Sequence, residues 1–185
     1  MQGTSRIAFQ GELGAFGHTA VSLVDANAYP VPMPTFDGVI TALRKGVASI
    51  GVLPVENVIV GPVQASIDAL RAAKDTMLIT EVTVPVRLCL LAVPGASIDL
   101  LREVHSQDIA LAQCGTFLAR HPHLVPGHAH DTAGAAQHIA RAKSPCVAAI
   151  ASERAAEHYA LDVLAAGIED RPGNATRFAV FALQP

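Results

Sequence analysis

A polar pentapeptide near the end of the chain carries residue types suited to chemistry on a small anion. It reads Asn174-Ala175-Thr176-Arg177-Phe178 and opens a final apolar segment. An amide, a hydroxyl and a guanidinium together offer several hydrogen-bond donors, and hydrogen bonds to ionised groups are stronger than those between neutral groups. A polar cluster at the start of an apolar strand therefore predicts a functional edge rather than a turn.

Two glycine-containing loops each lie between a predicted strand and a predicted helix. The first covers residues 11–18, GELGAFGH, and the second covers residues 56–62, ENVIVGP. In open α/β sheets such loops meet helix N-termini, whose N–H groups and dipole favour anions. His18 and Glu56 are the titratable candidates in these loops, although ordinary turns also use glycine.

The second half of the chain offers helix starts and a histidine group. Ser106 and Thr132 are expected as N-caps, which could also present helix starts to a ligand. The one metal-like pattern is His121, His123, His128 and His130. Prolines and a glycine within this segment indicate an exposed loop, and no cysteine or carboxylate completes a ligand set before Asp131, so a metal site is not expected.

Composition excludes several classes of function. The 13 basic and 16 acidic residues give a net charge of -3, without a basic cluster longer than Arg44-Lys45, so nucleic acid is not expected as a partner. No apolar run reaches the roughly 18 residues of a membrane span, and the N-terminus does not resemble a signal peptide. We therefore expect a cytoplasmic protein in which Cys89, Cys114 and Cys146 are buried thiols.

The elements that must position these groups follow an α/β pattern, which favours mostly parallel pairing. Strands are predicted at residues 6–10, 50–55, 77–93, 146–150 and 176–183. Helices are predicted at residues 17–26, 36–45, 63–73, 98–103, 109–120, 133–142 and 152–159. The stretch 77–93 is broken at Pro85 and has the length of a connection between two lobes, so we expect the hinge there.

In this order the segments resemble the prephenate dehydratase family along nearly the whole chain. The matching segments are residues 11–16, 51–57, 61–63, 89–91, 110–114, 131–136, 148–152, 168–170 and 174–178. The resemblance implies the two-lobed α/β fold of type II periplasmic binding proteins, with lobe 1 at about 1–82 plus 165–185 and lobe 2 at about 83–164. It also implies an active site between the lobes, a homodimer or higher homo-oligomer, and no cofactor.

The resemblance implies a reaction of phenylalanine biosynthesis that removes the ring hydroxyl and a carboxylate of prephenate together, giving phenylpyruvate, carbon dioxide and water. Thr176 matches the family threonine tied to loss of the hydroxyl. Because a threonine hydroxyl is a very weak acid, we expect it to donate a hydrogen bond to the leaving oxygen rather than a proton. Arg177 either binds a substrate carboxylate through two hydrogen bonds or makes a structural ion pair, and Phe178 is expected to pack in the core.

The candidate site combines these assignments. Catalysis is assigned to Thr176 and Glu56. Substrate binding is assigned to Gly14, Ala15, Phe16, His18, Asn57, Val58, Gly61, Thr132, Asn174, Arg177 and Phe178.

The chain also departs from the family pattern. Gly17, Val58 and Leu88 stand where the family usually has hydroxyl or imidazole groups. These departures leave three alternatives open: arogenate as the substrate, decarboxylation of prephenate without aromatisation, and carboxylate binding without catalysis. The chain ends soon after the Thr-Arg-Phe motif, so the phenylalanine-sensing ACT domain that family enzymes often carry is not expected.

Overall fold

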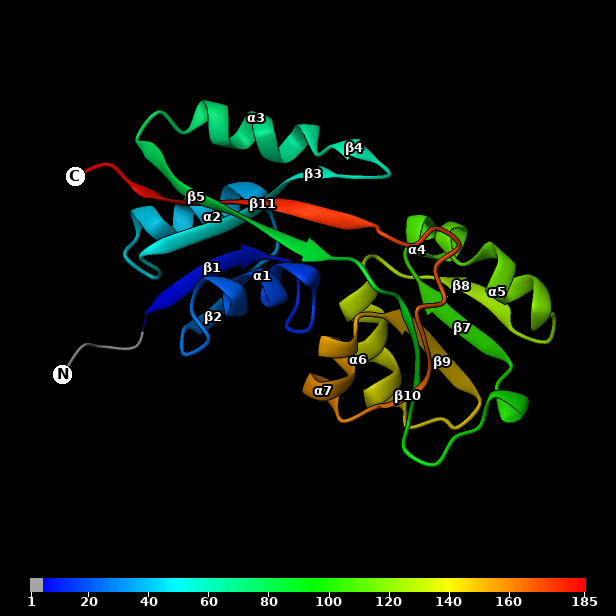
Figure 1. Ribbon diagram of the computed structural model, residues 1–185. Helices are drawn as coiled ribbons and strands as arrows, with labels where there is room; N and C mark the ends of the chain where they lie inside the picture. The colour runs from blue at the N-terminus through cyan, green and yellow to red at the C-terminus, as the bar shows by residue number, and fades with distance from the viewer. Residues whose placement is uncertain (1–4) are drawn as a thin grey trace. The chain divides into compact units, whose positions relative to one another are not determined.

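The computed structural model describes residues 5–185 as two compact units (Figure 1). Unit 1 comprises residues 5–85 and 174–185, and unit 2 comprises residues 86–173. The chain leaves unit 1 after Pro85 rather than after residue 82, because the last strand before the crossing stays paired as far as Pro85. It returns after Gly173 rather than after residue 164, because residues 162–166 form a strand of unit 2.

Unit 1 is built on one mixed sheet. In chain order its elements are β1 (Arg6–Gln10), α1 (Phe16–Val24), β2 (Tyr29–Met33), α2 (Phe36–Arg44), β3 (Ile50–Asn57), β4 (Gly61–Pro62), α3 (Gln64–Ala72), β5 (Thr76–Pro85) and β11 (Ala175–Leu183). The strand order is β2-β1-β3-β11-β5, with β4 paired to β3. Strand β1 is parallel to β2 and β3, whereas β11 is antiparallel to β3 and β5, so the expectation of mostly parallel pairing is wrong for this sheet.

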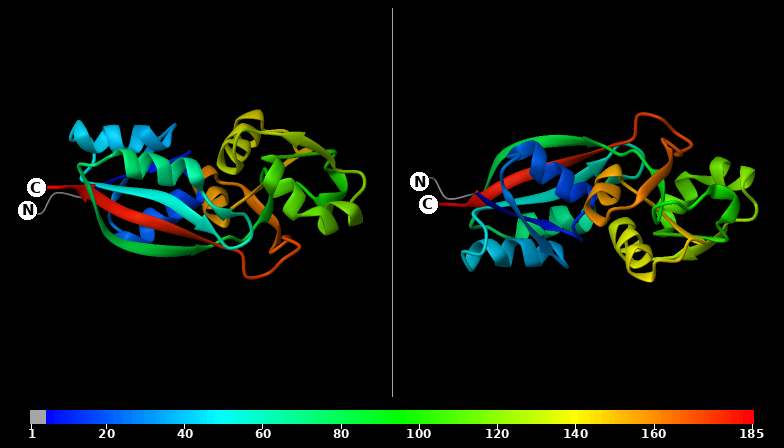
Figure 2. Two further views of the ribbon diagram at one scale, coloured as in Figure 1. Left: turned by 90° about the horizontal axis from the view of Figure 1, so that it is seen from above. Right: turned by 90° about the horizontal axis from the view of Figure 1, so that it is seen from below.

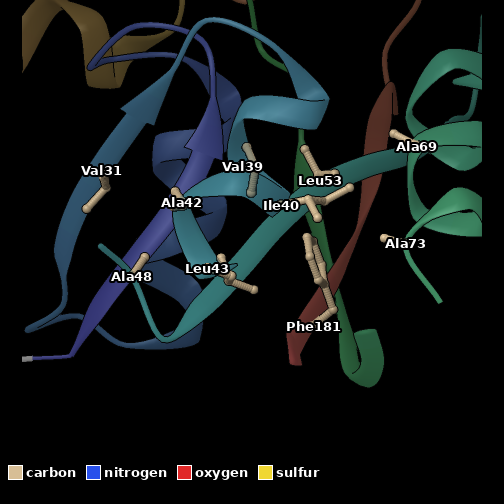
Figure 3. Packing of buried hydrophobic residues seen from close by; sticks show 11 residues of the cluster. Val31, Val39, Ile40, Ala42, Leu43, Ala48, Leu53, Ala69, Ala73 and Phe181 are labelled. Carbon is tan, nitrogen blue, oxygen red and sulfur yellow. The ribbon is translucent and has the colours of Figure 1, made fainter. Parts of the chain in front are cut away.

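The two faces of this sheet bury different clusters. On one face, here called the α1 face, Phe178 and Val180 of β11 pack with Ala20 and Val21 of α1. On the opposite face, the α3 face, Phe181 of β11 packs with residues of α2 and α3 (Figure 3). Successive side chains of a strand point to opposite faces, so β11 joins both clusters.

Glycine at position 51 allows the closest of these contacts. The ring of Phe181 lies over Gly51, its register partner on β3, and a Cβ there would lie 2.4 Å from the ring. Any larger residue would therefore displace Phe181 from the α3-face cluster.

Unit 2 is built on a second mixed sheet. Its elements are β6 (Cys89–Ala92), the 3-10 turn η1 (Ile98–Leu100), β7 (Glu103–Ser106), α4 (Asp108–Gln113), α5 (Gly115–Arg120), β8 (Val125–His128), α6 (Thr132–Ala142), β9 (Val147–Ala151), α7 (Glu153–Tyr159) and β10 (Asp162–Ala166). The strand order is β10-β6-β9-β7-β8, with parallel pairing on the β7 side and antiparallel pairing on the β6 side. Residues of α6 and α7 pack against β6 and β9.

The α/β class with two separate sheets is confirmed, but several local expectations are wrong. The helix predicted at 109–120 is broken at Cys114 into α4 and α5, and the segment 98–103 holds a 3-10 turn in place of a helix. Cys146 is exposed, whereas Cys89 and Cys114 are buried as expected. Within residues 5–185, none of the helices is long and apolar enough to cross a membrane.

Candidate functional site

The side-chain amide of Asn57 organises the polar end of β11. Its Nδ2 donates to Thr176 Oγ1 and to Asn174 Oδ1, both at 2.9 Å, and lies 3.2 Å from the carbonyl oxygen of Ala175. Its Oδ1 accepts hydrogen bonds from the backbone N–H groups of Ile59 and Val60, each at 3.0 Å. Asn57 thus joins the end of β3, the loop that follows it and the start of β11.

These contacts fix the orientation of the amide and, through it, of the Thr176 hydroxyl. A backbone N–H can only donate, so the atom that faces Ile59 and Val60 must be the oxygen of Asn57. The nitrogen therefore faces Thr176, whose oxygen accepts its hydrogen bond. Since the hydroxyl already accepts from Asn57, its own hydrogen points elsewhere, and the buried Thr176 is set up as a donor.

A β-bulge decides which residues accompany Thr176. The register between β11 and β3 shifts between Arg177 and Phe178, so that Thr176 pairs with Asn57 and Arg177 pairs with Glu56. Paired residues of neighbouring strands share a face, which places Asn57 and Thr176 on the α1 face and Glu56 with Arg177 on the α3 face. The structure therefore does not bring the Glu56 carboxylate to the Thr176 hydroxyl.

Arg177 is held between two carboxylates. Its Nη2 donates to Glu56 Oε2 at 2.7 Å, and its Nη1 lies 2.6 and 2.7 Å from the two carboxylate oxygens of Glu81 on β5. Hydrogen bonds from Glu81 and then Glu56 raise the pKa of Arg177 above its ordinary value. This is the structural ion pair that the sequence left open as an alternative, and Glu81 is the partner that sequence reasoning missed.

The first glycine loop is closed by His18. The backbone N–H of Gly14 donates to His18 Nδ1 at 3.0 Å, and the imidazole stacks on Phe9 with ring centroids 5.8 Å apart. Gly14 has a φ of 92°, which glycine adopts without strain. The exposed fraction of His18 is 7%. Because this buried imidazole accepts the hydrogen bond from Gly14, it fixes the shape of the loop that precedes α1.

Residues at the start of α1 support the same loop. Ala15 is the N-cap of α1 and has no side-chain group that could accept a hydrogen bond from the helix. Phe16 is half-buried against the α1-face cluster. A Cβ at Gly17 would lie 2.9 Å from the Phe9 ring, so this position has no room for the serine that the family pattern suggests.

The second loop exposes apolar side chains beside Asn57. Val58 donates its backbone N–H to the carbonyl of Ala175 at 2.9 Å, while its side chain is 70% exposed. Gly61 has a φ of 89°, which explains the glycine there. Phe178, in contrast, is buried in the α1-face cluster, as expected for a core residue.

The remaining predicted residues lie in unit 2. Asp131 is the N-cap of α6 and accepts a hydrogen bond from Gly134 at 2.7 Å, so Thr132 is the first helical residue and the prediction of it as the cap is wrong. Ser106 is also not a cap, because its hydroxyl donates to the carbonyl of Ile150 at 2.7 Å. Among the described residues, no group of three or more histidine, cysteine, aspartate or glutamate side chains could hold a metal ion.

Known proteins resemble this chain over nearly its whole length. The family model for prephenate dehydratase matches residues 7–185. The chain belongs to the prephenate dehydratase family. Arogenate dehydratase 5, chloroplastic, from Arabidopsis thaliana is 39% identical over 183 residues, which cover 98% of this chain and 43% of the relative. The chain thus spans less than half of that relative.

Solved structures support the family's fold for both units. The prephenate dehydratase of Arthrobacter aurescens, in complex with L-Phe, is 28% identical with a TM-score of 0.88 and covers 97% of this chain and 61% of its own. GqqA, described as a novel type of quorum quenching acylase, is 32% identical with a TM-score of 0.89 and covers 97% of this chain and 64% of its own. Solved structures with this architecture therefore carry more than one named activity.

Proposed function

We propose that this chain catalyses the decarboxylating dehydration of prephenate, or of arogenate, as a step of phenylalanine biosynthesis. The observation that supports this most directly is the donor orientation of the Thr176 hydroxyl, imposed by Asn57. Departure of a hydroxyl group from the ring needs a hydrogen-bond donor at the leaving oxygen. Membership of the prephenate dehydratase family points to the same reaction.

The chemistry assigns a limited role to each side chain. The bond between the ring and its carboxylate breaks, its electron pair enters the ring, and the carbon–oxygen bond to the hydroxyl breaks at the opposite side of the ring. Prephenate, a dianion, gives the phenylpyruvate anion, carbon dioxide and hydroxide; arogenate gives phenylalanine in the same way. Thr176 stabilises the charge that develops on the departing oxygen, and the hydroxide takes its proton from solvent.

Asn57 acts through Thr176. It holds the hydroxyl by an N–H donor, which also makes the hydroxyl a better donor, because hydrogen bonds in series polarise one another. Asn174 supports the amide from the other side through its Oδ1. Glu56 as a catalytic acid, and the contacts of Gly14, Phe16, His18, Val58, Gly61 and Thr132 with substrate, stay predictions.

The same geometry gives less support to acyl transfer, the activity named for GqqA. A threonine nucleophile needs a base that accepts its proton. The hydroxyl of Thr176 instead accepts a hydrogen bond from an amide N–H, which cannot act as a base. This arrangement favours a donor over a nucleophile.

The test is incubation of the purified chain with prephenate, and separately with arogenate, at neutral pH, with products identified by mass spectrometry. Phenylpyruvate or phenylalanine that disappears with Thr176→Val and persists with Thr176→Ser would support the proposal and name the substrate. Thr176→Val is the test variant because it keeps the shape of the side chain and removes only the hydroxyl, and Thr176→Ser, which keeps the hydroxyl, is its control.

Other products would contradict dehydration. A decarboxylated, non-aromatic product would identify the diverged decarboxylase, and binding of both compounds without turnover would indicate a carboxylate-binding domain. Hydrolysis of an N-acylated amine, run in parallel and sensitive to Thr176→Val, would replace the proposed reaction with acyl transfer.

Two further expectations belong to the same proposal. The family resemblance implies a homodimer or higher homo-oligomer with a small-molecule substrate as the main partner. A cytoplasmic location stays a prediction, because the plant relative is described as chloroplastic.

A further inference from the structure

Strand β5 is an exposed edge of the unit 1 sheet. It ends the strand order β2-β1-β3-β11-β5 and extends over ten residues, Thr76–Pro85. Figure 2 shows β5 as the outermost strand of unit 1 from above and from below. Edge strands of this length present unpaired backbone donors and acceptors, which proteins usually shorten, cover or protect with charge.

Consecutive apolar side chains on β5 are exposed to solvent. The exposed fractions are 45% for Met77, 59% for Leu78 and 52% for Ile79. A single exposed apolar residue is ordinary, but three in a row on a free edge combine apolar surface with unpaired backbone groups. This combination indicates a protein partner that adds a strand.

The only charged side chain of β5 does not guard this edge. Both carboxylate oxygens of Glu81 are bound by Arg177, at 2.6 and 2.7 Å, on the neighbouring strand β11. The charge that could repel a second strand is therefore turned back onto the sheet and compensated. The register shift between Val180 and Phe181 leaves Ile79 out of the pairing with β11, at the middle of the exposed segment.

The sequence of β5 is compatible with a two-fold axis. Its pairing with β11 places Met77, Thr80 and Val82 on the α1 face, and Leu78, Glu81 and Thr83 on the α3 face with Thr76. When two identical strands pair antiparallel at a sheet edge, each face continues into the same face of the second copy, so opposed residues must share a face.

One register satisfies this condition for every residue of the segment 76–83 that the pairing with β11 places on a face, which leaves out only Ile79. It centres the two-fold axis between Ile79 and Thr80, and pairs residues 76–83 of each copy. Met77 then lies opposite Val82 of the second copy, Leu78 opposite Glu81, and Thr76 opposite Thr83. Apolar and threonine pairs are favourable across strands, and the two Glu81 carboxylates are kept apart.

An apolar pocket extends the same surface. It lies on the α3 face beside Leu78, has a volume of about 280 Å³, and is lined also by Val55 and Ala179 of the sheet and by Ile67 and Leu70 of α3. Apolar surface that continues from the strand edge onto the face increases the area that a second copy would bury.

We propose that β5 pairs antiparallel with β5 of a second copy of this chain, joining the two unit 1 sheets into one continuous sheet across a two-fold axis. This surface specifies the interface of the homo-oligomer mentioned above, and it is independent of the catalytic activity. If the chain proves inactive on prephenate and arogenate, the inference about β5 is unaffected. If the chain proves to be a monomer, the proposed dehydratase activity is unaffected.

The first test measures the oligomeric state of the whole chain by sedimentation velocity. Wild type should sediment as a dimer, and Ile79→Lys should raise the dissociation constant at least about tenfold, because two lysines then lie beside the axis. Leu23→Lys, at a residue of α1 that is 56% exposed, is the matched control and should leave the dimer intact.

The second test checks the register by disulfide formation between two differently tagged chains. Both carry Cys146→Ser, because Cys146 is exposed, whereas Cys89 and Cys114 are buried. Met77→Cys in one chain should form a disulfide with Val82→Cys in the other. It should form much less with Thr80→Cys, which lies on the same face but in a different register.

The sedimentation and disulfide results together decide whether β5 forms the interface. Loss of the dimer with Ile79→Lys, together with the 77–82 disulfide, supports the proposal. A wild-type monomer would overturn it, and so would a dimer that tolerates Ile79→Lys and forms no 77–82 disulfide, since its interface would then lie elsewhere. Circular dichroism of each variant establishes that a monomer is folded.

Discussion

The two faces of the sheet in unit 1 treat adjacent residues of one motif in opposite ways. On the α1 face, Thr176 accepts a hydrogen bond from Asn57 and keeps its own hydrogen for another acceptor. On the α3 face, the guanidinium of Arg177 donates hydrogen bonds to the carboxylates of Glu56 and Glu81. The first arrangement leaves a donor open to a further acceptor, whereas the second closes the terminal nitrogens of Arg177 on carboxylates of the protein, so residues that are neighbours in a motif need not share a role.

The largest effect should come from the open face. Thr176→Val removes the hydroxyl and should lower kcat by about 10²- to 10³-fold, the usual result of losing one hydrogen-bond donor to a developing negative charge. KM should change little, because the ground state needs this donor less than the transition state does. Steady-state kinetics with prephenate and arogenate measures both quantities. Unchanged kcat in Thr176→Val would show that this hydroxyl is not the donor to the leaving oxygen.

A smaller loss is expected when the hydroxyl is turned rather than removed. Asn57→Asp keeps an oxygen for the N–H groups of Ile59 and Val60, but replaces the donor that faces Thr176 by an acceptor. The Thr176 hydrogen should then point at the carboxylate, and kcat should fall on the order of 10- to 100-fold.

The control for this variant is thermal stability. Asn57→Asp keeps the loop contacts but loses the donor to Asn174 and places a carboxylate oxygen beside the carbonyl of Ala175, so it should be less stable than wild type. Asn57→Leu also loses the loop contacts and should be less stable still. Full activity of Asn57→Asp would show that the amide does not orient Thr176.

His18 tests whether the first loop serves chemistry or shape. His18→Asn offers an oxygen to the Gly14 N–H and should keep activity within a few-fold, while His18→Leu leaves that buried N–H without its acceptor and should cost about 1–3 kcal/mol of unfolding free energy. Chemical denaturation and kcat/KM of the pair distinguish the two roles. An inactive but stable His18→Asn would instead place the imidazole in contact with substrate.

The smallest effect is expected on the closed face. Glu56→Gln should change kcat/KM by about threefold or less, because exposed ion pairs contribute little and Glu81 still holds Arg177. A proton donor would behave differently. Its deprotonation produces the fall in kcat/KM as pH rises, so its loss should abolish that limb of the pH profile. Loss of that limb in Glu56→Gln would restore Glu56 as the catalytic acid.

Most of the architecture could be predicted from the sequence, because apolar periodicity and strand-end loops are local properties. The helices α1, α2, α3, α6 and α7 and the strands β1, β3, β9 and β11 lie close to their predicted positions. Strand β2 was missed because Pro30 and Pro32 argue against a strand, yet an edge strand tolerates proline. Strand β8, the edge of the unit 2 sheet, contains Pro126 for the same reason.

The site was harder to predict because its arrangement depends on pairing between distant segments. Asn57, Asn174 and Thr176, which the sequence predicted as site residues, are joined by hydrogen bonds in the structure, but simple alternation along β3 would have placed Glu56 on the wrong face. Only the bulge opposite Arg177 corrects this, and a bulge leaves no local signature here. Glu81 was missed because its partner lies 96 positions away in the chain.

The position of β11 has a consequence for how the protein is made. It lies between β3 and β5 in the unit 1 sheet, although all of unit 2 precedes it in the chain. During synthesis unit 2 is a continuous segment that can fold as soon as it emerges, whereas unit 1 must wait with an incomplete sheet until residues 175–183 arrive. Thr176 enters with that strand, so the hydroxyl that we propose as the catalytic donor is in place only when the sheet of unit 1 is complete.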